Sequence, residues 1–155
     1  AIVWWAGARY CTSTGENLLQ TDQWDFSTSY YRVDRYYSIG QFSRYIPRGS
    51  FRTDVEKING TASTDKMPRE LTASAYLKDD DNTYTIVLVN SSKTKAFEAQ
   101  VEIDGKEFEN MVSYTSSSSV KWLRKKLNPS LSGKRTVTVP KYSVVTITGK
   151  FREKQ

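Results

Sequence analysis

The sequence predicts a mostly β protein, in which an antiparallel β-sandwich over residues 51–149 follows a short strand, a polar loop and one α-helix. Three observations predict this fold class. The hydrophobic period changes from helical to alternating near residue 50. Short alternating runs then recur, with turn residues about every 8 to 12 positions. One of these runs is apolar on both faces, as expected of a central strand between two layers.

The first fifty residues suggest a different organisation from the rest of the chain. Ala1 to Trp5 is apolar on both faces and predicts a short buried strand, whereas residues 7–29 have the polar composition of an irregular loop. A helix is expected over Tyr31–Ile46, with Tyr36, Ile39, Phe42 and Ile46 along one face. Pro47 ends it. The chain starts without Met inside an apolar run, so we expect it to be cut from a longer protein.

The alternating part of the chain begins with short predicted strands at Phe51–Val55 and Leu71–Lys78. The run Asp79-Asp80-Asp81-Asn82 predicts a turn and not a calcium site, because it lacks the glycine and distal glutamate of a known loop. Tyr84–Asn90 is apolar on both faces and predicts the central strand.

Further strands are expected towards the C-terminus. Phe97–Ile103 alternates cleanly, and Asp104-Gly105 predicts a tight hairpin to a return strand at Glu107–Thr115. Val120–Leu127 is expected to form a helical turn. The last strands are predicted at Arg135–Val139 and Tyr142–Thr148, before a basic tail over residues 150–155.

Composition limits the chemistry of the chain. The sequence has 155 residues, one cysteine (Cys11) and no histidine. This excludes an intramolecular disulfide, Ser-His and Cys-His nucleophile pairs, and a structural zinc site, and no cofactor or metal is expected. A glycosidase would need two carboxylates about 5 Å apart or somewhat more. No carboxylate lies in an apolar setting, and Glu98 and Glu102 share the solvent face of one predicted strand.

The net charge of +6 arises from 23 Lys and Arg against 17 Asp and Glu. Much of the excess lies late in the chain, in Lys121, Arg124, Lys125, Lys126, Lys134 and Arg135. Such a cluster can bind nucleic acid or an anionic surface, or form a solvated loop. Because no nucleic-acid motif accompanies it, we favour the solvated loop and expect no nucleic-acid partner. No stretch approaches the about 20 apolar residues of a membrane span.

The order of these segments resembles the C-terminal part of family-30 glycoside hydrolases, which include glucosylceramidases, endoxylanases and β-1,6-glucanases or galactanases. The most specific segment is the helix and turn from Tyr36 to Ser50, with its aromatic pair, Gly-Gln-Phe-Ser and Pro-Arg-Gly-Ser. Thr85–Ser92 resembles the family's central sandwich strand. Tyr114–Ser116, followed by Val137–Thr146, resembles its closing hairpin.

The resemblance implies a context for the chain. In this family a (β/α)8 barrel carries two catalytic glutamates, and a sandwich packs beside it and includes strands from the start of the enzyme. Residues 1–50 would then be the end of the barrel, with Ala1–Trp5 as its eighth strand and Tyr31–Ile46 as its eighth helix. Both glutamates would precede Ala1, so no catalytic residue is expected here, and a barrel domain is the implied partner. Family members act on polysaccharides or oligosaccharides, and the resemblance implies a secreted, periplasmic or cell-surface protein.

Several aromatic residues are candidates for sugar contact, because an aromatic face can stack on a pyranose ring. The resemblance places Trp5 near the sugar-binding cleft, beside Trp4. If the chain is instead a free-standing carbohydrate-binding module, exposed aromatics would be the platforms: Trp24, Tyr30, Tyr31, Tyr76 and Trp122. The alternatives are that these residues belong to the core or that the sandwich only braces a barrel. Asn59-Gly60-Thr61 and Asn90-Ser91-Ser92 match the glycosylation pattern.

Overall fold

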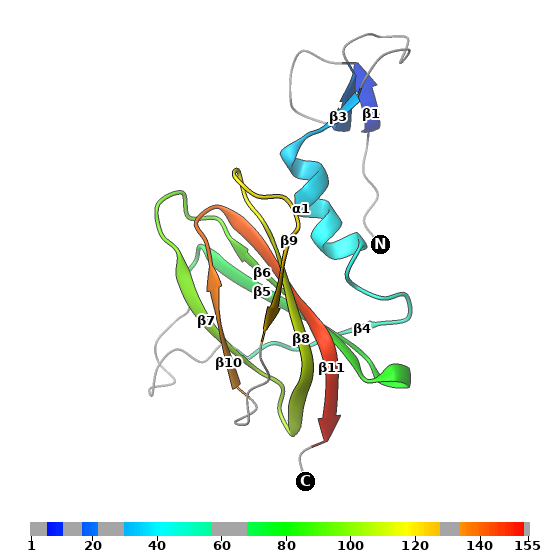
Figure 1. Cartoon of the computed structure of the whole chain (residues 1–155), viewed down its shortest axis with the longest axis vertical. Helices are drawn as coiled ribbons and strands as arrows, with labels where there is room; N and C mark the ends of the chain where they lie inside the picture. Colours follow the sequence, from blue (N-terminus) through cyan, green and yellow to red (C-terminus); the bar gives the residue numbers. More distant parts are fainter. Residues whose placement is uncertain (1–5, 11–16, 22–29, 57–67, 128–133, 154–155) are drawn as a thin grey trace.

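A computed structural model of the chain describes residues 6–10, 17–21, 30–56, 68–127 and 134–153 (Figure 1). The elements in the first third are β1 Ala6–Tyr10, β2 Asn17–Thr21, β3 Tyr30–Arg32, α1 Asp34–Ser43 and β4 Phe51–Thr53. The later elements are β5 Leu71–Lys78, η1 Asp79–Asp81, β6 Thr83–Asn90, β7 Phe97–Glu102, β8 Lys106–Ser116, β9 Leu123–Leu127, β10 Lys134–Val139 and β11 Ser143–Glu153.

Six strands form the larger sheet, in the order β4-β5-β6-β11-β8-β9, and every neighbouring pair is antiparallel. β6 and β11 occupy the centre, which explains why Tyr84–Asn90 is apolar on both faces. The predicted central strand is therefore confirmed. β7 and β10 form a second, two-stranded antiparallel sheet.

The two sheets enclose one hydrophobic core. The larger sheet contributes buried side chains that include Tyr84, Ile86, Leu88, Val145 and Ile147. Val101, Val137 and Val139 enter the same cluster from the two-stranded sheet. The fold is therefore mostly β and sandwich-like, as predicted, with one helix packed on the outer face of the larger sheet (Figure 1).

The predicted hairpin at Asp104-Gly105 is wrong as a pairing. The turn exists, because Gly105 has a φ of +69° and the amide of Lys106 donates to the carbonyl of Ile103 over 3.2 Å. However, β7 pairs with β10, and β8 pairs with β9 and β11. Both flanking segments bury an apolar face in the same core from opposite sides, so the turn carries the chain from one sheet to the other.

The predicted closing hairpin is corrected for the same reason, since β10 pairs with β7 and β11 lies in the larger sheet. Asn90 fixes this second crossing. Its buried side-chain amide donates to the carbonyls of Lys95, Val139 and Pro140 over 2.8, 3.2 and 2.9 Å. Because its amide is buried and hydrogen-bonded, Asn90 does not present the glycosylation acceptor that its sequence pattern suggests. The other candidate, Asn59, lies outside the described residues.

Three other elements differ from the sequence predictions. Residues 123–127 form the edge strand β9 and not a helical turn, because Leu127 pairs opposite Met111 and both are buried. Within the predicted loop of residues 7–29, β1 and β2 pair in parallel and β3 joins β2. The helix is shorter than predicted and covers Asp34–Ser43, since residues 30–32 pair with β2.

Within the described residues, no helix is long and apolar enough to cross a membrane.

Gly149 lies at a close approach between the backbones of β11 and β8. A Cβ at this position would lie 1.4 Å from the carbonyl oxygen of Asn110 and 2.9 Å from the Tyr84 hydroxyl. We predict that Gly149→Ala destabilises the chain by at least about 3 kcal/mol in urea unfolding, since the backbone must move.

Gly105→Ala is the matched control for this prediction. A Cβ there meets no atom within 4 Å, so only the strain of its φ of +69° remains, about 1–2 kcal/mol. Equal losses in the two variants would contradict the steric explanation for Gly149.

Candidate functional site

The aromatic residues proposed to contact sugar do not form one cluster in the described part of the chain. Trp4, Trp5 and Trp24 lie outside the described residues. Tyr30 and Tyr31 on β3 are 59% and 48% exposed. Because successive residues of a strand point to opposite faces, these two rings do not share a platform. Tyr76 is half-buried on β5.

Trp122 lies in the connection between β8 and β9 and packs on α1. Its indole Nε1 donates to the carbonyl of Tyr37 over 3.0 Å, and its backbone amide donates to Ser116 Oγ over 3.2 Å. The guanidinium carbon of Arg44 lies 4.7 Å from the centre of the indole ring. This packing holds Trp122 half-buried, with a φ of +50°. Its contribution to sugar binding stays a prediction.

The glycine of the helix makes this contact possible. A Cβ on Gly40 would lie 2.4 Å from Cζ2 of Trp122. Glycine in the middle of a helix costs roughly 0.5–1 kcal/mol relative to alanine. At this position it gives the indole room to approach the helix backbone.

Gln41, which the sequence analysis did not single out, is the buried polar link between α1 and the larger sheet. Its Nε2 donates to Ser116 Oγ over 2.8 Å and to the carbonyls of Tyr114 and Val144, each over 3.3 Å. Its backbone carbonyl accepts from Thr146 Oγ1 over 3.2 Å. The side chain is 0% exposed. The helix is therefore fixed to two strands of the larger sheet, β8 and β11, by one residue.

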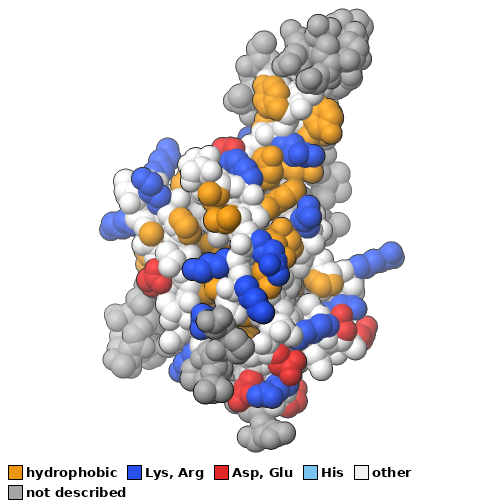
Figure 2. All heavy atoms as spheres, in the orientation of Figure 1, with side chains coloured by type: hydrophobic (Ala, Val, Ile, Leu, Met, Phe, Trp, Pro, Cys, Tyr) orange, Lys and Arg blue, Asp and Glu red, His pale blue; other side chains and the backbone are white. Residues whose placement is uncertain are grey.

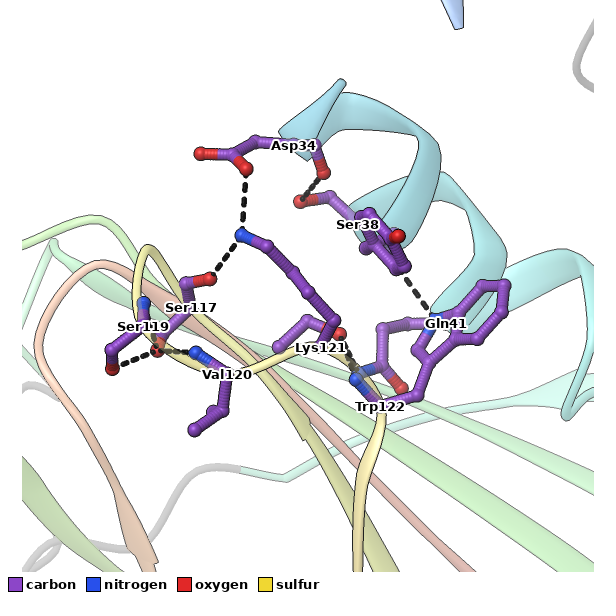
Figure 3. Close-up of polar contacts among 10 residues, drawn as sticks. Asp34, Ser38, Gln41, Ser117, Ser119, Val120, Lys121 and Trp122 are labelled. Carbon is purple, nitrogen blue, oxygen red and sulfur yellow. Dashed lines mark hydrogen bonds and ion pairs between the residues drawn. The ribbon is translucent and has the colours of Figure 1, made fainter. Parts of the chain in front are cut away.

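Two further contacts hold the ends of α1. Near its start, Lys121 Nζ lies 2.6 Å from Asp34 Oδ1 and 2.6 Å from the carbonyl oxygen of Ser117 (Figure 3). Just after its end, the ring of Tyr45 stacks on Tyr114 with 4.0 Å between ring centres. Burial raises the pKa of the Tyr45 hydroxyl. The predicted buried face differs from this arrangement, since Tyr36, Ile39, Phe42 and Ile46 are all only half-buried.

The described carboxylates do not suggest a general acid. Glu98 and Glu102 are exposed on β7, as predicted. Asp81 lies in the turn after β5, where a hydrogen bond from Thr83 and, to a lesser extent, the nearby Lys150 lower its pKa. A general acid for glycoside cleavage needs a raised pKa. No group of ligands that could hold a metal ion occurs among the described residues.

We predict that Gln41→Glu destabilises the chain by about 3 kcal/mol at pH 7, because a buried carboxylate would face carbonyl oxygens without a donor. The pKa of this glutamate should be raised in the folded state. Stability is then lost as the pH rises above about 4.3, where the unfolded chain ionises and the folded chain does not. Urea unfolding at pH 4 and pH 7 measures this effect.

Gln41→Met is the control for the pH dependence, because it removes the amide without adding a titratable group. Its stability relative to the parent chain should not change between pH 4 and pH 7. If Gln41→Glu lost no more stability at pH 7 than at pH 4, the buried donor role of Gln41 would be wrong.

No protein-family model and no curated protein matches the chain. Among solved structures, it is similar to a GH30 endoxylanase from Clostridium papyrosolvens C71, at 25% identity and a TM-score of 0.64, covering 77% of this chain and 28% of that chain. A family-30 subfamily-8 xylanase from Clostridium acetobutylicum matches at 22% identity, with the same coverage and TM-score.

A third match extends over more of the chain. The catalytic domain of GH30 xylanase C from Talaromyces cellulolyticus matches 94% of this chain at a TM-score of 0.65 and 16% identity. In each of the three cases the chain spans less than a third of the matched structure, 28% or 29% of its length. The chain therefore has the fold of the C-terminal part of family-30 glycoside hydrolases, as the sequence motifs indicated.

Proposed function

We propose that this chain is the non-catalytic C-terminal region of a family-30-like glycoside hydrolase that acts on a plant or microbial polysaccharide. In this proposal the sandwich braces a (β/α)8 barrel, and exposed aromatic residues such as Tyr31 contact carbohydrate. Residues 1–50 are then the end of the barrel, residues 51–149 the sandwich and residues 150–155 a basic tail. An exported protein fits this role, since its polysaccharide substrate lies outside the cell.

The attachment of α1 to the larger sheet is the observation that carries the bracing role. Gln41 joins the helix to β8 and β11 through buried hydrogen bonds, and Trp122 packs on the helix backbone. The other side of α1 still carries Ile39 and Phe42, and Ile46 follows the helix; all three are only half-buried. A helix with one face fixed to a sandwich and a second apolar face available suits an element shared between a barrel and its side domain.

The free-standing carbohydrate-binding module remains the second candidate, because Tyr30 and Tyr31 are exposed. Their placement on opposite faces of β3 favours it less, since a flat platform needs rings on one face. The two candidates share carbohydrate contact by exposed aromatic residues and differ in whether the sandwich also braces a barrel.

The proposal predicts that the purified chain releases no reducing sugar from xylan, β-1,6-glucan or β-1,6-galactan. Reducing-sugar assays over long incubations measure this. Hydrolysis by the pure chain would show that the catalytic residues lie within it and would contradict the proposal. Binding to the same neutral polymers is measured in parallel. Binding that is lost in Tyr31→Ala would support carbohydrate contact by Tyr31, which both candidates include.

Bracing also predicts that α1 and the larger sheet open together. In native-state hydrogen exchange, the amides of α1 should be protected to about the same degree as those of β11, because Gln41 couples α1 to β8 and β11. Gln41→Met should lower protection in α1 and leave β11 protected. Free exchange throughout α1 in the parent chain would contradict the bracing role.

A further inference from the structure

Three cations lie on the side of the larger sheet that α1 covers: Arg44, Arg124 and Lys126, here called the cationic strip. Arg124 is the cross-strand partner of Tyr114, and Lys126 is the partner of Val112, so both point to the same face of the sheet. The ring of Tyr114 stacks on Tyr45, which adjoins Arg44. The stacked pair Tyr45–Tyr114 therefore lies between Arg44, at the end of α1, and Arg124 on the edge strand β9.

The charges of the cationic strip are not neutralised within the described part of the chain. All three side chains belong to exposed residues, and none of them forms an ion pair with a described carboxylate. Other cations are paired, for example Lys121 with Asp34 and Arg152 with Glu107. In Figure 2, Lys and Arg gather over the middle of the visible face, where β9 lies in Figure 1, while Asp and Glu lie nearer its margins.

Protection of the sheet edge explains only part of this arrangement. Charged residues on an edge strand prevent pairing with another chain, and Lys125 on the opposite face of β9 serves this purpose as well as Lys126 does. Arg44 lies after the helix and not at a sheet edge, yet it reaches the same surface. Like charges brought together without counter-charges create a positive potential that attracts anions.

We propose that the cationic strip binds a polysaccharide that carries carboxylate groups, such as a uronic-acid polymer. Arginine presents a planar fork of donors that matches a carboxylate, and the strip offers two arginines. Arg124 and Lys126 lie two residues apart on one face of an extended strand, about 7 Å along it. Separated charges of this kind suit an extended polymer with repeated anionic groups better than one compact anion.

Nucleic acid fits the strip less well. The ring of Tyr114 is covered by Tyr45, and Arg44 lies 4.7 Å from the centre of the Trp122 ring, so these rings do not offer the open faces on which unpaired bases stack. Three cations are also few beside the about 6–10 phosphate contacts typical of duplex binding. The choice of a polysaccharide among polyanions rests on the proposed function.

The test is isothermal titration of the full chain with polygalacturonate at low salt, compared with neutral xylan and a DNA duplex. We expect polygalacturonate to bind more tightly than either, and added salt to weaken the binding. Replacing all three strip residues by Gln (R44Q, R124Q, K126Q) should weaken it about tenfold, as expected for three exposed charge contacts. A control that removes the same charge from exposed positions elsewhere is R52Q, R69Q and K93Q, which should change the affinity less than about twofold.

Two single substitutions on β9 test the position of the binding surface more sharply than the triple variants do. Lys126→Gln and Lys125→Gln remove the same charge from adjacent positions of β9, but the two side chains point to opposite faces of the sheet. Only Lys126→Gln should weaken binding to polygalacturonate. Unfolding midpoints of both variants check that the fold is intact.

Three outcomes would overturn the cationic strip as a polysaccharide site: equal weakening by the control triple, equal effects of Lys125→Gln and Lys126→Gln, or tighter binding of the DNA duplex than of polygalacturonate. None of these outcomes alters the hydrolysis or hydrogen-exchange results, so failure of this inference and failure of the proposed function are distinguishable.

Discussion

The position of α1 depends on the side-chain amide of Gln41. A buried amide without partners costs about 1–3 kcal/mol, whereas one that donates to three oxygens fixes both distance and direction. The acceptors of Gln41 lie on β8 and β11, at Tyr114, Ser116 and Val144. A helix that slipped by one residue would bring Phe42 or Gly40 to these oxygens and leave them without a donor. This requirement for one register also places Arg44 and Tyr45 beside Tyr114, and so determines the surface at the edge of the sheet.

The strands could be predicted from the sequence because their pattern is local. Tyr84–Asn90 has both faces apolar, and Phe97–Glu102 alternates, and each becomes a strand close to the expected bounds. The partners of these strands could not be predicted in the same way. Asp104-Gly105 is a good turn signal, but a turn dipeptide does not record whether the next strand returns to the same sheet or crosses to the opposite one. That choice depends on which layer lacks a strand, and this is a property of the whole core.

The helix shows a similar limit. Tyr36, Ile39, Phe42 and Ile46 have the spacing of a buried face, yet the most buried residues of α1 are Gly40 and Gln41. Tyr37, Gln41 and Tyr45 recur every four residues, and a glutamine between two aromatics on one helical face was the available signal for a buried polar link. Trp122 was named from the sequence only as a candidate platform for sugar. Its contact with Gly40 joins residues 82 positions apart and could not be predicted from either segment alone.

The strand order of the larger sheet has a consequence for synthesis of the chain. β11 is the last of the described strands, yet it lies between β6 and β8 and pairs with both. Until it emerges from the ribosome, β4-β5-β6 and β8-β9 are two separate antiparallel pieces with apolar faces open to water. Non-local pairing of this kind folds slowly and exposes intermediates to aggregation. The nascent chain would therefore gain its cooperative stability in one late step, when a single strand closes the gap between two halves that are already synthesised.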